Sequence, residues 1–275
     1  MKRIFMYELR RRKNALFLYN SIMLGISLVA IFILFTAKEP FSGVFALWTF
    51  ITVAALTVIP TVMFVTCSSG HIRDLLYTNE SYLMLTVPVR STHILLGRML
   101  AGLVEFIACF VTASICGIVY FSAWTAVTEK IGRLRFFNML SRSIKHIFAL
   151  NYDFLFKSLF IGLCIFCFLG AIIIFVRALT CSFIKKRRIA EFLALIIFIF
   201  IVYLVQEFSN WLTIKLNLQV SAYLYVNQHF FDPTLQSYLH RYPAELPIIG
   251  SVFLLIIGIS FFFASAWLFK HRIEV

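Results

Sequence analysis

The stretch FLALIIFIFIVYLV, residues 192–205, is an unbroken run of uncharged and almost wholly apolar residues. It lacks the alternation of apolar and polar positions that a strand of a membrane β-barrel needs. Each large apolar residue near the middle of a helix favours membrane insertion by roughly 0.5 kcal/mol. The stretch therefore predicts a membrane helix that tolerates Glu191 and Glu207 at its two edges.

Five further uncharged runs extend over residues 14–37, 40–70, 106–128, 158–176 and 246–269. A helix needs about 20 apolar residues to cross a bilayer. Since 61% of the residues are hydrophobic and 13% are charged, we expect an all-α integral membrane protein, with residues 1–275 forming one membrane domain. The predicted helices cover residues 15–37, 44–66, 94–122, 154–178, 189–211 and 247–269.

Lysine and arginine are distributed unevenly between the predicted loops. If the N-terminus is cytoplasmic, 16 of the 25 basic residues fall on the cytoplasmic side. Cytoplasmic loops of membrane proteins carry such an excess, so both termini are predicted to be cytoplasmic. The net charge of +13 is interpreted as attraction to anionic membrane lipids, with no nucleic-acid partner expected.

The predicted outer loop, residues 129–152, is basic and so departs from this bias. Drawn as a helix over residues 134–150, it gathers its large apolar side chains on one face and Arg135, Arg142 and Lys145 on the other. We expect it to lie flat on the membrane with its cations at lipid headgroups. A second interpretation is a surface that contacts an amphipathic or anionic substrate.

The outer segment between the last two predicted helices, residues 208–246, is rich in tyrosine and contains several prolines. Aromatic residues at this density suit the headgroup region of a membrane. Short interfacial or re-entrant helices are therefore expected in this segment.

Motifs of known enzymes are missing from the sequence. It contains no zinc-protease, serine-hydrolase or nucleotide-binding signature, so no catalytic, cofactor-binding or metal-binding residue is expected. The nearest approach to an acid/base or metal group is His229 with Asp232 and His240 in the 208–246 segment. Cys164 and Cys167 have a C-x-x-C spacing, but they lie inside a predicted spanning helix and are interpreted as packing residues.

Glu105 lies well inside the third predicted helix, some eleven residues after Ile94. An unpaired charge in hydrocarbon costs at least about 2.5 kcal/mol. Two interpretations stay open. The carboxylate either reaches lipid headgroups at the inner interface or makes a polar contact in a transport path or a subunit interface.

A polar interruption separates the second and third predicted helices, SSGHIRDLLYTNESYLMLTVPVRSTHILLGRML at residues 68–100. Residues 72–86 are predicted to form a short helix across the inner membrane face. Asp74 and Glu80 would contact water there, and leucines would provide an apolar packing side. Pro88 ends this helix and disfavours helical backbone at Val87.

This interruption resembles the cytoplasmic loop between the second and third helices of type-2 ABC exporter permeases, the transmembrane subunits of bacterial ABC transporters. Their pattern is D-L-L/Y…E-S/G-Y-L-x-L-T-L-P-V…I-L-L-G-K-L-L. The matching residues are Asp74, Leu75, Leu76, Glu80, Tyr82, Leu83, Leu85, Thr86, Pro88, Val89, Ile94, Leu95, Leu96, Gly97 and Leu100. The general topology of the whole chain is similar, but only residues 74–100 are specific.

The resemblance implies a cytoplasmic coupling helix that docks in a groove of a separate ATPase subunit, which binds the ATP and magnesium. It also implies an ABC ATPase dimer as partner, a second permease copy or a sister permease, and a location in the cytoplasmic membrane of a bacterium. The chain would then export an amphipathic or hydrophobic substrate and have no catalytic site of its own. The residues expected at the ATPase are Arg73, Asp74, Glu80, Tyr82, Leu83 and Pro88.

Two other classes of function remain open from the sequence. One is a membrane-embedded lipid-modifying enzyme that uses the histidines and the aspartate of the 208–246 segment. The other is an accessory or sensory membrane protein that binds a partner without transport. Activity of the purified chain alone would favour the enzyme, and independence of ATP would favour the sensor.

Overall fold

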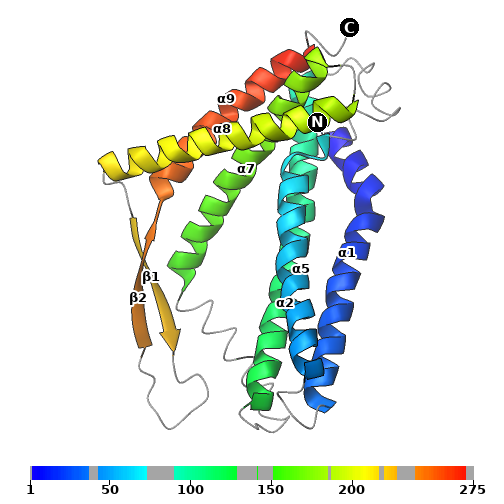
Figure 1. The fold of residues 1–275 in the computed structure, drawn as a ribbon, viewed down its shortest axis with the longest axis vertical. Coiled ribbons are helices and arrows are strands. Elements are labelled where there is room, and N and C mark those ends of the chain that lie inside the picture. Colours follow the sequence, from blue (N-terminus) through cyan, green and yellow to red (C-terminus); the bar gives the residue numbers. More distant parts are fainter. Residues whose placement is uncertain are drawn as a thin grey trace.

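A computed structural model describes residues 2–36, 43–72, 90–128, 141, 151–184, 187–216, 220–227 and 239–270. Within these ranges, six helices are long and apolar enough to cross a membrane, which confirms the all-α class and indicates a multi-pass membrane protein (Figure 1). They are α1 (Lys2–Thr36), α2 (Gly43–Ser68), α5 (Ser91–Thr128), α7 (Tyr152–Phe183), α8 (Arg187–Leu216) and α9 (Ile248–Leu268).

Most of these helices extend beyond the predicted boundaries. Helix α1 begins at Lys2 rather than residue 15, and α5 covers Ser91–Thr128 rather than residues 94–122. For α1, the prediction began the helix only after the charged residues of positions 2–13. In the structure, the charged residues Glu8 and Arg12 of α1 are buried against other helices, so they continue the helix instead of ending it.

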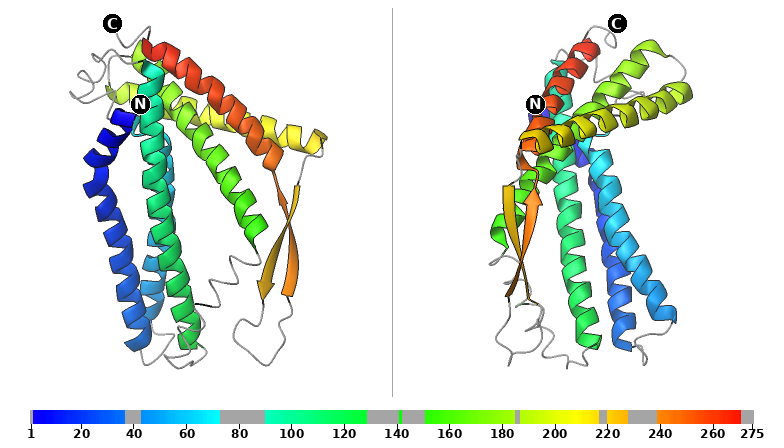
Figure 2. Two further views of the ribbon diagram at one scale, coloured as in Figure 1. Left: turned by 180° about the vertical axis from the view of Figure 1, so that it is seen from behind. Right: turned by 60° about the vertical axis from the view of Figure 1, so that its left-hand side comes forward.

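The helices form two groups. Helices α1, α2 and α5 run side by side along the long axis of the molecule, and α7 packs mainly on α9 (Figures 1 and 2). Contacts of α2 with α7 and of α5 with α9 connect the two groups. Helix α1 begins and α9 ends at the same end of the molecule, as the predicted topology requires.

Helix α8 runs across the direction of α1, α2 and α5 in all three views (Figures 1 and 2). Its candidate span, Arg188–Leu212, has the length and hydropathy of a membrane helix. The sequence predicted an orientation like that of the other five. Helix α8 contacts chiefly α7 and α9. Among those of its residues whose burial is described, Ala190, Ala194 and Ser209 are buried, so few contacts align α8 with α1, α2 and α5.

A two-stranded antiparallel hairpin follows α8, formed by β1 (Val220–Asn227) and β2 (Leu239–Leu246). The prediction of short interfacial or re-entrant helices over residues 208–246 is therefore wrong for the described part of this segment, where α8 continues to Leu216 and the two strands follow. Residues 217–219 and 228–238 lie outside the described residues. The sequence VSAYLYVN is rich in the aromatic and β-branched residues that favour strands. Pro243 is tolerated in β2, opposite Tyr223, because both strands of a two-stranded ribbon are edges.

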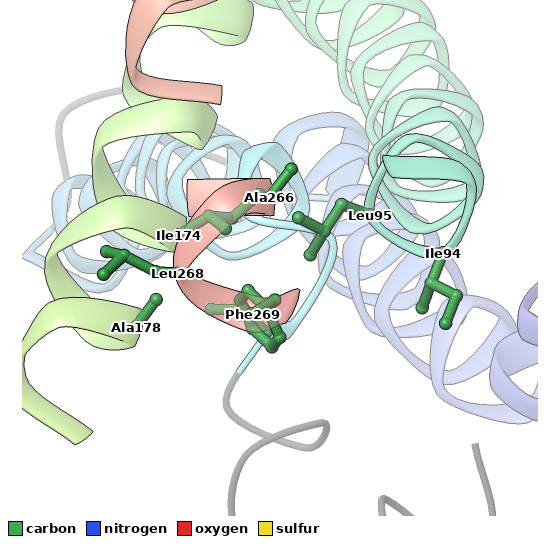
Figure 3. Close-up of a cluster of buried hydrophobic side chains, with 8 residues drawn as sticks. Ile94, Leu95, Ile174, Ala178, Ala266, Leu268 and Phe269 are labelled. Atoms are coloured by element: carbon green, nitrogen blue, oxygen red, sulfur yellow. The ribbon is translucent and has the colours of Figure 1, made fainter. Parts of the chain in front are cut away.

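An apolar cluster joins the two helix groups near the end of the molecule where α9 ends. Ile72, which follows α2, and Leu95 of α5 are 0% and 1% exposed. They share this cluster with Ile174 of α7 and with Phe269, which follows α9. Figure 3 shows Leu95 beside Ala266, between the α5 and α9 ribbons. The residues on both sides of segment 73–89 are thus anchored where the two helix groups meet.

The predicted topology places Ser141 outside the cell. A single cysteine introduced by Ser141→Cys, in a chain whose native cysteines are replaced by alanine, is expected to react with a membrane-impermeant maleimide in intact cells. The matched control, Lys2→Cys, should react only after lysis. Protection of Ser141→Cys until lysis would contradict the predicted topology.

Candidate functional site: a buried polar cluster

Charged and polar side chains from α1, α5 and the end of α2 meet inside the apolar helix bundle. Glu8, Arg98 and Glu105 are 0%, 2% and 3% exposed. An isolated charge at such a site is costly, so each needs a partner of opposite sign. This polar cluster consists of Glu8, Arg12, Cys67, His71, Arg98 and Glu105.

Charges of alternating sign follow one another through the polar cluster. Arg98 donates from Nε and Nη2 to Oε1 of Glu8 at 2.8 and 2.7 Å. The second carboxylate oxygen of Glu8 lies 3.2 Å from Nη2 of Arg12, and Nη1 of Arg12 lies 3.8 Å from Oε2 of Glu105. The charges of two carboxylates and two guanidinium groups therefore balance one another. The Glu8–Arg98 and Arg12–Glu105 contacts connect α1 to α5 at two positions along the helices.

The end of α2 brings His71 to this cluster through a specific backbone turn. The N–H of Gly70 donates to the carbonyl of Cys67 at 2.9 Å, and that of His71 to the carbonyl of Thr66 at 3.4 Å. This pair of bonds is the Schellman arrangement at a helix C-terminus. Gly70 has a φ of 55° and His71 a φ of 51°, a left-handed conformation that glycine adopts without steric cost.

Two glycines let neighbouring helices approach the end of α2 very closely. A Cβ atom at Gly102 of α5 would lie 2.0 Å from the carbonyl oxygen of Cys67, and one at Gly170 of α7 would lie 2.1 Å from that of Ser68. Only a residue without a side chain fits at these separations. The close approach at Gly102 brings α5, with Glu105 one turn later, against the side chain of Cys67.

The resulting contacts bring three potential ligand atoms together. Nε2 of His71 lies 3.1 Å from Oε2 of Glu105, and Sγ of Cys67 lies 3.7 Å from the same oxygen and 3.8 Å from Nε2. In the part of the chain that the structure describes, these three side chains form a group whose ligand atoms lie close enough together to hold a metal ion. Cys67 and Glu105 are buried, whereas His71 is partly exposed.

Comparisons with known proteins do not identify a family for this six-helix chain. No family model, curated protein or solved structure matches it. The resemblance of residues 74–100 to type-2 ABC exporter permeases therefore rests on the motif quoted above.

Most of the site residues predicted from sequence fall outside the described residues. These include the expected ATPase contacts (Arg73, Asp74, Glu80, Tyr82, Leu83 and Pro88), the basic face of the outer helix (Arg135, Arg142 and Lys145), and His229 and Asp232. His240 lies in β2. Cys164 is buried and Cys167 partly buried, and both are free cysteines of α7.

Glu105 is the predicted site residue that the structure describes fully. Its carboxylate contacts His71, Cys67 and Arg12 within the protein, so the interpretation in which it reaches lipid headgroups does not fit its surroundings. A role of this contact in transport or subunit assembly stays a prediction. If Glu105→Gln and Glu105→Leu transport substrate and assemble as well as the unaltered protein does, the predicted role of Glu105 in transport or assembly is contradicted.

The partners of Glu105 were not predicted, although part of the signal was present in the sequence. Glu8 and Arg12 are four residues apart, and Arg98 precedes Glu105 by seven, so each pair shares one helix face. Arg12 and Arg98 are among the 16 basic residues that the predicted topology places on the cytoplasmic side, and that count does not reveal their pairing. His71 could not be found this way, because it lies beyond the end of α2 in a left-handed conformation.

A separate cavity of about 330 Å³ lies between α2, α7 and α8. Its lining is apolar except for Arg177 and Glu191. From the sequence, Glu191 is expected at one edge of its helix. In the structure α7 continues six residues past Arg177 to Phe183, and Glu191 lies in the second turn of α8.

Proposed function

We propose that this chain is the membrane-spanning subunit of an ATP-driven ABC exporter that moves an amphipathic or hydrophobic substrate. ATP would be bound and hydrolysed by a separate ATPase dimer, and a second permease copy or a sister permease would complete the transporter in the bacterial cytoplasmic membrane. The chain itself would have no catalytic site. The proposal starts from the resemblance of residues 74–100 to the coupling loop of such permeases.

The observation that carries the proposal is the anchoring of the two ends of segment 73–89. Ile72, directly before it, is fully buried in the apolar cluster shared by α5, α7 and α9. Ser91, directly after Arg90, begins α5 and donates from its hydroxyl to the carbonyl of Ala266 of α9 at 3.2 Å. A force applied to the segment would therefore reach helices of both groups.

The polar cluster strengthens this mechanical connection. Arg98 lies two turns into α5 and is held by Glu8 of α1, and His71 lies two residues before the segment and is held by Glu105. Charged contacts between helices prefer discrete arrangements over continuous sliding, because a displaced buried charge loses its partner. Alternation between two packings of the helices is the transport mechanism that such connections support.

The test is purification of the tagged chain from its native membrane in mild detergent, followed by mass spectrometry and an ATPase assay. We expect a copurifying protein with a Walker motif and measurable ATP hydrolysis. The double variant Glu80→Arg/Leu83→Asp should lose this partner while still inserting into the membrane, because it replaces an acidic and an apolar contact of the expected docking helix.

A matched control is Asp232→Arg/Leu235→Asp, which makes the same types of change in the predicted outer segment and should retain the ATPase. Copurification of the ATPase with both double variants would contradict the predicted docking residues. A chain that purifies alone in several detergents would contradict the exporter proposal. Lipid-modifying activity of that isolated chain, lost in the Asp232 variant, would support the membrane-embedded enzyme instead.

A further inference from the structure

We propose that Cys67, His71 and Glu105 form a binding site for a divalent transition-metal ion of the zinc class. The three donor atoms are Sγ of Cys67, Nε2 of His71 and Oε2 of Glu105. This site is a property of the chain alone, and it does not depend on the exporter assignment.

The distances between the donor atoms already fit a tetrahedral ion. Zinc bonds of about 2.0–2.3 Å to oxygen, nitrogen and sulfur place neighbouring ligand atoms about 3.3–3.6 Å apart. The observed separations are 3.1 Å between nitrogen and oxygen, 3.7 Å between sulfur and oxygen and 3.8 Å between sulfur and nitrogen. Shifts of a few tenths of an ångström in the side chains therefore suffice to coordinate the ion.

A second observation also indicates a ligand at this position. Oε1 of Glu105 is buried and has no hydrogen-bond partner among the residues that the structure describes, although a buried carboxylate oxygen normally has one. An ion bound at Oε2, or a water molecule bound to that ion in the fourth position, would lie beside this oxygen. Three protein ligands and one open position are the arrangement of many zinc sites that act on a bound molecule.

The backbone holds the three ligands in place before an ion arrives. Cys67 is in the last turn of α2, His71 is placed by the Schellman turn at Gly70, and Glu105 is on α5 next to the close approach at Gly102. His71 is 27% exposed whereas Glu105 is 3% exposed, so the ion would enter from the side of His71.

The chemistry of the ligands selects the type of ion. A thiolate and an imidazole favour zinc and similar transition metals, whereas magnesium and calcium prefer sites made wholly of oxygen atoms. On binding, the Cys67 thiol loses its proton to water, so a thiolate and a carboxylate together neutralise the two charges of the ion.

Arg12 opposes metal binding, because its guanidinium lies 3.8 Å from Oε2 of Glu105. The same guanidinium lies nearer to Glu8, at 3.2 Å. Arg12 can thus keep its ion pair with Glu8 when the carboxylate of Glu105 coordinates the metal ion. The site is consequently expected to bind zinc more weakly in a Glu8→Gln variant, in which Arg12 has Glu105 as its remaining carboxylate in the cluster.

The test uses the full chain, purified in detergent with a tag that contains no histidine. After removal of metal with a chelator, it is titrated with Zn²⁺, and with Co²⁺ as a spectroscopic probe. We expect one ion per chain and a sulfur-to-cobalt charge-transfer band. Glu105→Gln and His71→Asn should weaken binding by at least about 100-fold, since loss of a ligand exceeds the roughly 10–100-fold effect of an outer-shell change.

Cys67→Ala should abolish the charge-transfer band, and Cys109→Ala, which removes another buried cysteine, should retain it. The glutamine of Glu105→Gln has nearly the shape of glutamate, so this variant should still fold. It therefore tests the proposal even if Cys67→Ala does not fold. Absence of stoichiometric binding to the unaltered chain would overturn the proposal. Binding of equal strength in the unaltered chain and in Glu105→Gln would also overturn it.

Discussion

Replacement of Arg98 by methionine is expected to lower the free energy of unfolding by about 3–5 kcal/mol, because the carboxylates of Glu8 and Glu105 would then share the guanidinium of Arg12, which leaves one buried negative charge of the polar cluster uncompensated. The carboxylate of Glu8 is fully buried and receives two contacts from Arg98, at 2.8 and 2.7 Å. The methionine side chain preserves most of the apolar contacts of the arginine stem. The loss of stability therefore comes from the charge.

The measurement is a titration of the purified chain from folding detergent into sodium dodecyl sulfate, with the fraction unfolded followed by circular dichroism. Lys157→Met is the matched control, because it breaks the ion pair of Lys157 with Asp153, which also has a 2.7 Å contact but is solvent-accessible. Exposed pairs of this kind contribute about 0–1 kcal/mol. Equal losses of unfolding free energy in Arg98→Met and Lys157→Met would contradict the view that burial gives the Glu8–Arg98 pair its larger contribution to stability.

A double variant separates the charge from the packing. Glu8→Gln/Arg98→Met removes both members of the pair and leaves Arg12 and Glu105 to balance each other. Its loss of stability is expected to be smaller than the sum of the losses of the two single variants, because neither buried charge remains without a partner. Additive losses would contradict a direct interaction between Glu8 and Arg98.

Replacement of Gly170 by alanine is the second change with a large expected effect. The new Cβ would lie 2.1 Å from the carbonyl oxygen of Ser68, so α7 and α2 would have to separate. Overpacking of a well-packed interior costs about 1–3 kcal/mol, and the upper part of this range is expected because the opposing atom belongs to the backbone. The thermal midpoint of unfolding in detergent should fall accordingly.

The control for this change is Gly162→Ala in the same helix. A Cβ at Gly162 meets no atom of the described residues within 4 Å, and replacement of glycine by alanine inside a helix stabilises it by roughly 0.5–1 kcal/mol. The two variants should therefore shift the midpoint in opposite directions. A fall of similar size in both would contradict the close approach of α7 to the end of α2.

The fold was predicted best where local hydropathy decides the structure. An uncharged run such as residues 192–205 favours insertion whatever its neighbours are, so all six helices were predicted. The orientation of α8 was not predicted, because hydropathy contains no information about the angle between one helix and its neighbours. The hairpin at Val220–Leu246 was missed because tyrosine and proline suit a membrane interface as well as an edge strand.

The candidate site was predicted only in part, for a related reason. Glu105 could be singled out because a carboxylate is unusual in an apolar helix. Its surroundings depend on the approach of α1 to α5, which brings together Glu8 and Arg98, 90 positions apart in the sequence. Gly102 and Gly170 make the close contacts possible. Gly117 and Gly162 look the same in the sequence, yet a Cβ at either one would meet no atom within 4 Å in the part of the chain that the structure describes.

Hydropathy and charge thus established that the chain is a helical membrane protein, because the free energy of insertion is a sum over residues close together in sequence. The motif at residues 74–100 added a hypothesis about function. The pairing of Glu8, Arg12, Arg98 and Glu105, and the meeting of Cys67 with His71 and Glu105, arose from the packing of α1, α2 and α5. Buried charges take whichever partners the backbone brings within reach, and that choice is made in three dimensions.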